Sequence, residues 1–188
     1  MTYFAHFHLN ADAAIMVTGS HNPSEYNGFK MVLAKHSFYA EDIQSLQKLI
    51  DQNDLKLIEG EIVNQDIKED YNERLLQNIN LNKKIKIAWD IGNGAMGAVI
   101  KEITSNLNNS DNILINEEVD GNFPNHHPDP TVPKNMEQLV KVVKDKNCDI
   151  GLAFDGDGDR LGVVDNLGNL VWADQYMLVL CSEITNLY

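Results

Sequence analysis

Short apolar runs alternate with segments of helical spacing along the first part of the chain. Residues 3–9 have the spacing of part of a helix, and the runs Ala13–Val17 and Phe29–Leu33 predict two strands. The first strand ends directly at turn residues, so we expect it to be buried. A helix is predicted where apolar residues recur at Ile43, Leu46, Leu49 and Ile50. Another is predicted over residues 67–79, and the polar stretch 80–84 follows it.

The alternation restarts after this polar stretch. Strands are predicted over residues 85–89, 113–115 and 150–154, and helices near residues 98–106 and 136–143. Asn135 would cap the second of these helices, with Gln138 three residues further on. Two more apolar runs, 161–164 and 170–172, flank the turn residues Asn166-Leu167-Gly168 and predict a hairpin. The pattern is typical of an α/β sheet protein with a domain boundary near residue 80.

Size and charge narrow the possible partners. The chain has 188 residues, and its 28 acidic against 15 basic residues give a formal net charge of −13. Nucleic acids and anionic membrane surfaces attract positive charge, so we expect neither as a partner. No apolar run approaches the roughly 20 residues that a membrane helix needs. No secretion leader is recognisable, and Cys148 and Cys181 lack metal-ligand spacing. We therefore expect a reduced, cytoplasmic chain with buried thiols.

The hexapeptide Thr18-Gly19-Ser20-His21-Asn22-Pro23 follows the first predicted strand. Ligands of open α/β sheets lie at the carboxyl ends of strands. Gly19 permits a tight turn and Pro23 stiffens its exit, which would hold the Ser20 hydroxyl on a rigid loop. A plain turn without chemistry is the alternative. A hydrolase nucleophile elbow is excluded, because Thr18 and Asn22 stand where its glycines belong.

Asp155, Asp157 and Asp159 alternate with glycines after another predicted strand. Three carboxylates at this spacing can converge on one point, which is costly without a cation because like charges raise each other's pKa. Oxygen ligands of this kind suit Mg²⁺ or Ca²⁺. An EF-hand is excluded, since its glycine and glutamate positions hold Arg160 and Asn166. An acidic turn is the alternative.

Two further loops carry candidate residues. Gly92, Gly94 and Gly97 form a G-x-G-x-x-G after a predicted strand, and Glu117 and Glu118 lie about 20 residues further on, as in a dinucleotide site. Close strand–helix packing would explain the same glycines. Residues 123–130 contain three prolines and predict a rigid loop. We expect the side chains of its two adjacent histidines, His126 and His127, to have hydrogen-bond partners, and we assign them no role.

These loops together resemble the α-D-phosphohexomutase superfamily, nearest to its bacterial phosphomannomutase/phosphoglucomutase branch. Residues 18–30 are similar to its phosphoserine loop and residues 155–160 to its metal loop. Residues 90–97 and 124–130 also resemble that family. The resemblance runs along essentially the whole chain and implies two consecutive mixed-sheet α/β domains. The later part of the first domain would occupy residues 1–79, and the second domain residues 80–188.

The resemblance implies an enzyme that interconverts hexose 1-phosphates and hexose 6-phosphates through a hexose 1,6-bisphosphate. Ser20 would be carried phosphorylated. Mg²⁺ would be bound by four residues, namely Ser20, Asp155, Asp157 and Asp159. Lys30 matches the family's lysine that assists proton transfer or positions the sugar hydroxyl. His21 would line the same loop, and Arg160 would stabilise charge on the transferring group.

The same family has four domains, so the resemblance also implies that parts of its active site are absent here. The sugar loop and the distal phosphate clamp lie in the later domains, and the motifs of this chain therefore do not distinguish mannose from glucose. We expect little activity from the chain alone, with the missing domains supplied by a second chain. An NAD(P)-binding Rossmann-type domain and a non-catalytic partner half remain the alternatives.

Overall fold

The computed structural model describes residues 1–53 and 58–185. Its internal contacts divide the chain into two compact units. The first unit comprises residues 1–18 and 28–73, and the second comprises residues 19–27 and 74–188. The boundary that the sequence places between residues 79 and 80 stays a prediction. Among the described residues, no helix has the length and apolar character needed to cross a membrane.

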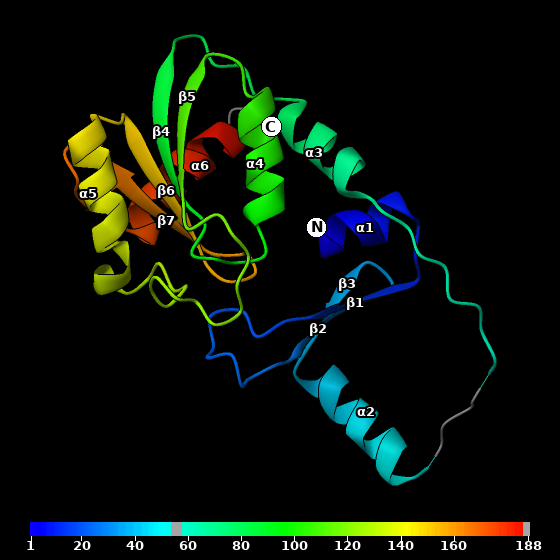
Figure 1. Cartoon of the computed structure of the whole chain (residues 1–188). Coiled ribbons are helices and arrows are strands. Elements are labelled where there is room, and N and C mark those ends of the chain that lie inside the picture. The colour runs from blue at the N-terminus through cyan, green and yellow to red at the C-terminus, as the bar shows by residue number, and fades with distance from the viewer. Residues whose placement is uncertain (54–57, 186–188) are drawn as a thin grey trace. The chain divides into compact units, whose positions relative to one another are not determined.

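The first unit contains a three-stranded antiparallel sheet in the order β1-β2-β3, shown in Figure 1. Its elements are α1 (Thr2–His8), β1 (Ala13–Val17), β2 (Phe29–Leu33), β3 (His36–Phe38), α2 (Glu41–Asp51) and the first part of α3 (Lys68–Leu76). Helix α1 packs against β1, and the Phe4 ring lies 5.3 Å from that of Tyr71 in α3. Both strands and the helices that the sequence predicts in this unit are confirmed.

The expected burial of β1 is wrong. Its residues alternate between half-buried and exposed positions, and Ile15 and Val17 are 63% and 61% exposed. Successive strand side chains point to opposite faces of a sheet, so one face of β1 is covered and the other is open. A short apolar run shows that a strand is present but not how many of its faces are covered.

The second unit contains a five-stranded mixed sheet in the order β5-β4-β6-β7-β8. Its main elements are β4 (Ile85–Asp90), α4 (Gly97–Asn106), β5 (Ser110–Ile115), the 3₁₀ turn η1 (Pro133–Met136), α5 (Glu137–Lys146), β6 (Ile150–Phe154), β7 (Leu161–Asp165), β8 (Leu170–Val171) and α6 (Ala173–Thr185). Strand β4 pairs in parallel with β5 and β6, and β6, β7 and β8 pair antiparallel. The predicted hairpin and the α/β class are confirmed.

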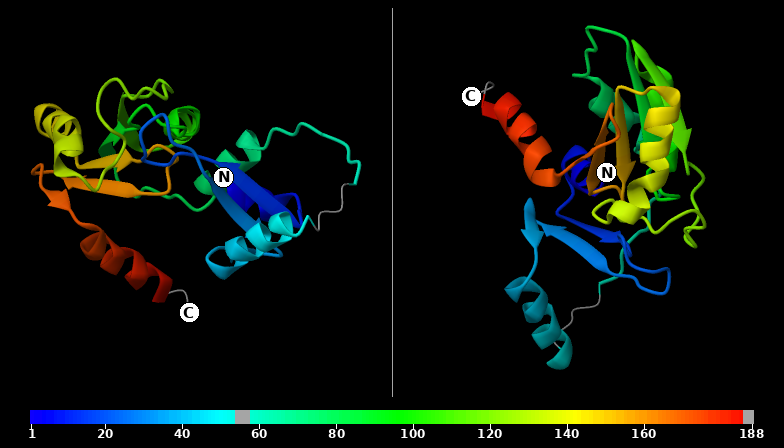
Figure 2. Two further views of the ribbon diagram at one scale, coloured as in Figure 1. Left: turned by 90° about the horizontal axis from the view of Figure 1, so that it is seen from below. Right: turned by 90° about the vertical axis from the view of Figure 1, so that its left-hand side faces the viewer.

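Two apolar clusters form the core of this unit, one on each face of β4. Ala88 packs with Leu139 and Val143 of α5. Trp89 packs on the opposite face with Ile100 of α4. Figure 2 shows these helices and strands from two further directions. Helices on both faces bury the parallel strands, as is usual for α/β sheets.

The strand order places the loops after β4 and β6 at one end of the sheet. The chain crosses through α4 to β5 on one side of β4 and returns through α5 to β6 on the other. The carboxyl ends of β4 and β6 therefore flank a topological switch point, where α/β sheets bind their ligands. Residues 91–97 and 155–160 follow these two strand ends.

Two smaller expectations are corrected. Asn135 does not cap α5, because it lies within η1 and the N-cap residue is Met136, without a side-chain cap. The side-chain amide group of Asn135 instead donates to the Asp129 carbonyl at 2.9 Å. Of the two thiols expected to be buried, Cys148 is buried but Cys181 is exposed on α6. The expectation rested on the reducing compartment, which does not determine where a thiol lies in the fold.

Candidate active site

Ser20 lies in a tight loop that follows β1. Its backbone is left-handed, with φ of +52°, a conformation that costs a residue other than glycine on the order of 1 kcal/mol. The Asn22 amide donates to the Gly19 carbonyl at 2.9 Å, and the Tyr26 amide to the Pro23 carbonyl at 2.9 Å. A Cβ atom on Gly19 would lie 2.9 Å from the Tyr26 carbonyl oxygen, so the turn requires glycine there.

The Ser20 hydroxyl faces the acidic loop. Its Oγ donates to Asp155 Oδ2 at 3.0 Å and also lies 3.3 Å from Asp157 Oδ1. His21 Nδ1 lies 3.3 Å from the same Oγ. Ser20, His21 and the acidic loop all belong to the second unit. The unit therefore holds one hydroxyl oxygen between two carboxylates and an imidazole nitrogen.

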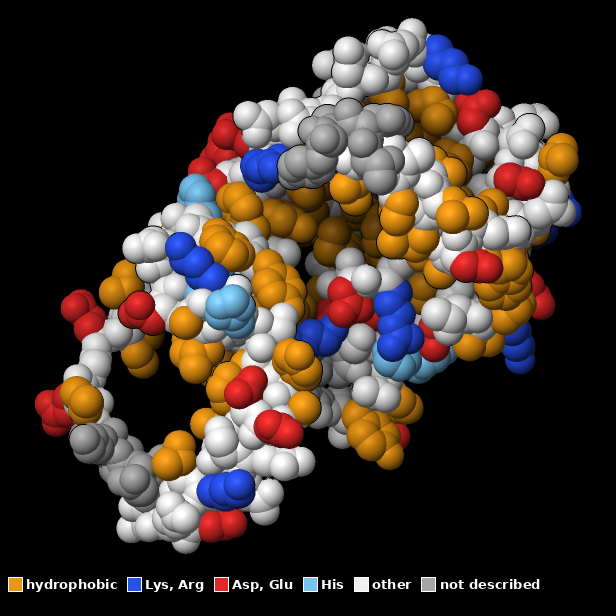
Figure 3. Space-filling view, turned by 180° about the vertical axis from the view of Figure 1, so that it is seen from behind, with side chains coloured by type: hydrophobic (Ala, Val, Ile, Leu, Met, Phe, Trp, Pro, Cys, Tyr) orange, Lys and Arg blue, Asp and Glu red, His pale blue; other side chains and the backbone are white. Residues whose placement is uncertain are grey.

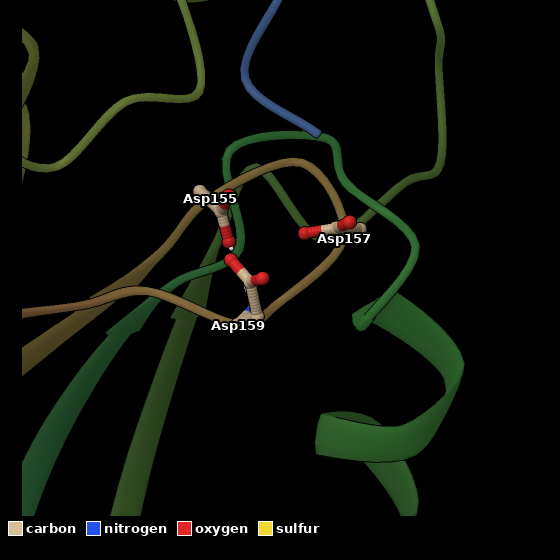
Figure 4. A group of neighbouring side chains, drawn as sticks. All are labelled: Asp155, Asp157 and Asp159. Carbon is tan, nitrogen blue, oxygen red and sulfur yellow. Dashed lines mark hydrogen bonds between the residues drawn. The ribbon is translucent and has the colours of Figure 1, made fainter. Parts of the chain in front are cut away.

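The three aspartates of this loop converge on one point. One carboxylate oxygen from each lies within 4.8 Å of the others, a grouping that can hold a metal ion. Figure 4 shows the side chains of Asp155, Asp157 and Asp159 facing one another inside the loop that follows β6. An all-carboxylate donor set of this kind fits a hard divalent cation.

Asp155 is the buried member of the triad, with no exposed surface. Its Oδ1 accepts hydrogen bonds from the Asp159 and Arg160 amides at 2.9 and 3.0 Å, which fixes the loop around it. Burial, together with the charges of Asp157 and Asp159, raises the pKa of Asp155 despite these bonds and the one from Ser20. The raised pKa thus reflects burial first and the two neighbouring carboxylates second.

The glycine-rich loop packs against the acidic loop. The Ala95 amide donates to the Gly156 carbonyl at 2.8 Å. A Cβ atom on Gly94 would lie 2.8 Å from the same oxygen, and one on Gly97 would collide with the Glu117 carbonyl. Close backbone approach therefore accounts for these glycines without a nucleotide.

His126 is satisfied by a buried carboxylate. Its Nε2 lies 2.9 Å from Asp90 Oδ2, at the end of β4, where Asp90 has no exposed surface. The other oxygen of Asp90 accepts hydrogen bonds from the Gly92 amide at 3.0 Å and the Asn116 amide group at 2.9 Å. The hydrogen bond to Asp90 outweighs partial burial and raises the pKa of His126. His127 is exposed.

Arg160 ends the acidic loop and pairs with a residue that the sequence did not single out. Its Nη1 lies 3.7 Å from Asp129 Oδ1. Lys30 lies on β2 in the first unit, where its pairing partner is Met16. The second unit thus brings together every predicted site residue except Lys30. The catalytic and metal-binding roles assigned to these residues stay predictions.

Sequence reasoning missed Asp90 and Asp129 as parts of this site. Asp90 directly follows the strand predicted over residues 85–89 and precedes the glycine-rich turn, which is a weak signal for a ligand-end residue. Asp129 follows Pro128 in the rigid loop, 31 residues before Arg160 in the chain. Nothing local in the sequence indicates that pairing.

Family profiles match both parts of the chain. The profile described as phosphoglucomutase/phosphomannomutase, alpha/beta/alpha domain II matches residues 69–168, and that of domain I matches residues 1–56. The two matches place the unit that holds the acidic loop and Ser20 in the phosphohexomutase class. The chain belongs to the phosphoglucomutase/phosphomannomutase family, and the dinucleotide-binding alternative is not favoured.

Relatives and solved structures agree with this assignment. The chain is 44% identical to a phosphomannomutase/phosphoglucomutase of Pseudomonas putida over 97% of its own length and 39% of the relative's. It is 39% identical to a phosphoglucomutase of Neisseria meningitidis serogroup A over 99% of its length and 41% of the relative's. A crystal structure of a phosphoglucomutase/phosphomannomutase family protein from Burkholderia thailandensis superposes with a TM-score of 0.88 at 39% identity, covering 93% of this chain and 38% of that one. The chain spans about two fifths of the length of these relatives.

Proposed function

We propose that this chain carries the phosphoserine and metal loops of a phosphohexomutase, which interconverts hexose 1-phosphate and hexose 6-phosphate. The observation that carries the proposal is the Ser20 Oγ, 3.0 Å from Asp155 Oδ2 within a single packed unit. A serine held in this way, next to a group of three carboxylates, suits a hydroxyl that accepts and returns a phosphoryl group. The names of the relatives supply the substrate class.

The first chemical step is a phosphoryl transfer from a hexose 1,6-bisphosphate to Ser20. The Ser20 Oγ forms a bond to phosphorus as the bond from phosphorus to the sugar oxygen breaks. His21 Nδ1, 3.3 Å away, accepts the hydroxyl proton when the ring is neutral. The hexose monophosphate leaves with the oxygen of the broken bond, which takes up a proton from solvent and becomes a sugar hydroxyl. The reverse transfer, to the other end of a bound hexose monophosphate, completes the interconversion.

The charges around Ser20 explain why a cation is needed. A phosphoserine carries about −1.5 to −2 at neutral pH, and three carboxylates converge beside it. We propose that Asp155, Asp157 and Asp159 bind Mg²⁺ together with an oxygen carried on Ser20. The bound ion neutralises charge on the transferring group. Arg160 supplies a further positive charge from the end of the same loop.

The distal parts of the substrate site are proposed to lie in residues beyond this chain's two family domains. The relatives are about two and a half times as long, since the chain spans 39–41% of their length. A mutase holds both ends of its bisphosphate while the intermediate reorients. We therefore expect little turnover of glucose 1-phosphate by the chain alone, and more when the remaining family domains are supplied as a second chain. We place this chemistry in the cytoplasm.

Labelling of Ser20 tests the proposal. The chain is incubated with glucose 1,6-bisphosphate and Mg²⁺, and phosphorylated peptides are mapped by mass spectrometry. We expect slow labelling of Ser20. The label should be absent in Ser20→Ala and unchanged in Ser24→Ala. Ser24 is a matched control because it lies exposed in the same loop. Label on Ser24, or label that survives Ser20→Ala, contradicts the proposal, as does an unlabelled chain when the remaining domains are present.

A further inference from the structure

Residues 126–129, in the segment between β5 and η1, form a short stretch that is fixed to the end of the sheet. His126 is held by the buried Asp90 carboxylate at 2.9 Å. Pro128, two residues on, is fully buried. A Cβ atom on Gly92 would lie 3.3 Å from Pro128, and one on Gly156 would lie 3.6 Å from it. The stretch thus lies against both loops of the candidate active site.

Asp129 follows Pro128, and its carboxylate is held in one orientation. Its Oδ1 accepts hydrogen bonds from the Thr131 amide at 3.0 Å and the Thr131 hydroxyl at 2.7 Å. The Asp129 amide donates to the His127 carbonyl at 2.8 Å, and its carbonyl accepts from Asn135 at 2.9 Å. The side chain is only 13% exposed. A nearly buried carboxylate with a fixed backbone on both sides makes a rigid point of negative charge.

A cationic side chain of the candidate site pairs with this carboxylate. Arg160 Nη1 lies 3.7 Å from Asp129 Oδ1. Partial burial by itself raises the pKa of Asp129, but the hydrogen bonds from Thr131 and the charges of His21 and Arg160 outweigh it and lower the pKa. The hydrogen bonds of Thr131 explain a turn, whereas the ion pair with Arg160 explains why the residue is an aspartate.

We propose that Asp129 is a positioning residue, which holds the Arg160 guanidinium at the phosphoryl-transfer site. Arginine has a long side chain with about 2 kcal/mol of rotamer entropy. Arg160 also directly follows Asp159, so without another anchor its guanidinium is attracted into the group of three carboxylates. The ion pair with Asp129 engages the guanidinium instead and leaves those carboxylates for a cation. The catalytic part of this inference rests on the proposed function, but the contact itself does not.

The contact is tested by NMR on the full chain, with Asp129→Asn as the main variant. The amide oxygen of asparagine can still accept from Thr131, so the turn is kept and the charge is lost. Asp120→Asn is the matched control. Asp120 accepts two hydrogen bonds from Asn122, both at 2.9 Å, yet no ion pair of Asp120 is found in residues 1–53 and 58–185.

The readout is the Nε–Hε signal of Arg160. The chain has two arginines, Arg74 and Arg160, so two signals are expected. The signal that disappears in Arg160→Lys is that of Arg160. In the wild type, we expect the heteronuclear NOE of Arg160 to exceed that of Arg74. In Asp129→Asn the Arg160 value falls to that of Arg74, whereas in Asp120→Asn it is unchanged. An Arg160 signal that is the same in Asp129→Asn and wild type overturns the proposal.

Two further variants separate positioning from folding. Asp129→Ser keeps a side-chain acceptor for the Thr131 amide without charge, and it replaces Asp129→Asn if that variant unfolds. Asp129→Glu restores the charge and is expected to restore part of the Arg160 order. Loss of order in the Ser variant without any recovery in the Glu variant indicates a structural role alone and contradicts the proposal.

The rate of Ser20 labelling by glucose 1,6-bisphosphate then tests the catalytic consequence. A misplaced group can cost up to about 100-fold in rate, so we expect Asp129→Asn to label between about 10- and 100-fold more slowly than Asp120→Asn. Equal labelling rates overturn the positioning role. An unlabelled wild type counts against the proposed function instead, and the NMR comparison still decides whether Asp129 holds Arg160.

Discussion

Strand β4 of the second unit is packed on both faces, whereas strand β1 of the first unit is open on one. Ala88 of β4 has no exposed surface and its neighbour Trp89 is 8% exposed, while Ile15 and Val17 of β1 are more than 60% exposed. Exposed apolar side chains are visible over much of the surface in Figure 3. Strand β1 is entirely apolar and β4 contains Lys86 and Asp90, so the difference comes from what covers the strands and not from their composition.

The contrast explains where the candidate site obtains its rigidity. The loop after β1 is closed at its base by the Thr18 amide, which donates to the Gly28 carbonyl at 3.0 Å. Its tip, residues 19–27, nevertheless belongs to the second unit. A Cβ atom on Gly156 would collide with the Ser20 carbonyl oxygen, so the tip lies directly against the acidic loop. The position of Ser20 is thus set by the better-packed unit.

The largest expected effect comes from core truncation in the two units. Leu139 of α5 has no exposed surface, and Leu33 of β2 is 49% exposed. Leu139→Ala should lower the free energy of unfolding of the second unit by about 2–5 kcal/mol, because it removes a buried side chain and leaves a cavity. Leu33→Ala should cost less than about 1 kcal/mol in the first unit. Hydrogen exchange by mass spectrometry, read on peptides from each unit, measures both; equal losses would contradict the comparison.

A glycine substitution breaks the contact between the two loops of the second unit. Gly94→Ala would place a Cβ atom 2.8 Å from the Gly156 carbonyl oxygen, whereas a Cβ atom on Gly121 meets nothing within 4 Å. We expect Gly94→Ala to cost about 1–3 kcal/mol, as overpacking does, and Gly121→Ala to cost much less. Urea unfolding followed by the fluorescence of the buried Trp89 measures the difference. Similar midpoints for the two variants would show that the loops do not need this close approach.

Strands β4 to β8 and helices α4 and α5 of the second unit could be read from the sequence because their apolar spacing repeats along the chain. Helix α6 was not predicted. The burial of β1 could not be read in this way, because an apolar run of five residues carries no information on the far face of its sheet. The acidic loop and Ser20 were found because their residues lie close together in the chain. Asp90–His126 and Asp129–Arg160 were not, since 36 and 31 residues separate the partners and only the fold brings them together.

Addition of Mg²⁺ should distinguish the units by stabilising only one of them. A ligand that binds the folded state at ten times its dissociation constant stabilises that state by about 1.4 kcal/mol. We expect this gain in hydrogen-exchange protection for peptides of the second unit, which holds the three carboxylates. Asp157→Asn should remove most of the gain and Asp120→Asn none of it. Equal protection of both units by Mg²⁺ would point to non-specific binding.

The smallest expected effect concerns two histidine–carboxylate pairs, one in each unit. His126 and Asp90 form a pair with side chains 15% and 0% exposed, whereas His8 and Asp70, 3.3 Å apart, are 38% and 50% exposed. The hydrogen bond to Asp90 raises the pKa of His126 above its usual 6.5 in the folded state. The folded protein therefore binds the proton more tightly than the unfolded chain. The stabilisation is complete below pH 6.5 and is lost as the pH rises through the raised pKa.

Wild type should accordingly lose about 1 kcal/mol of stability relative to His126→Gln between pH 6 and pH 9, a typical net value for one hydrogen bond. His8→Gln is the control for removal of a histidine from an exposed ion pair, which contributes little to stability. Urea unfolding at a series of pH values, followed by circular dichroism, gives both differences. Parallel pH profiles for wild type and His126→Gln would mean that the imidazole is not charged against Asp90. Residues 126–129 would then be held at His126 by neutral hydrogen bonds and by the packing of Pro128.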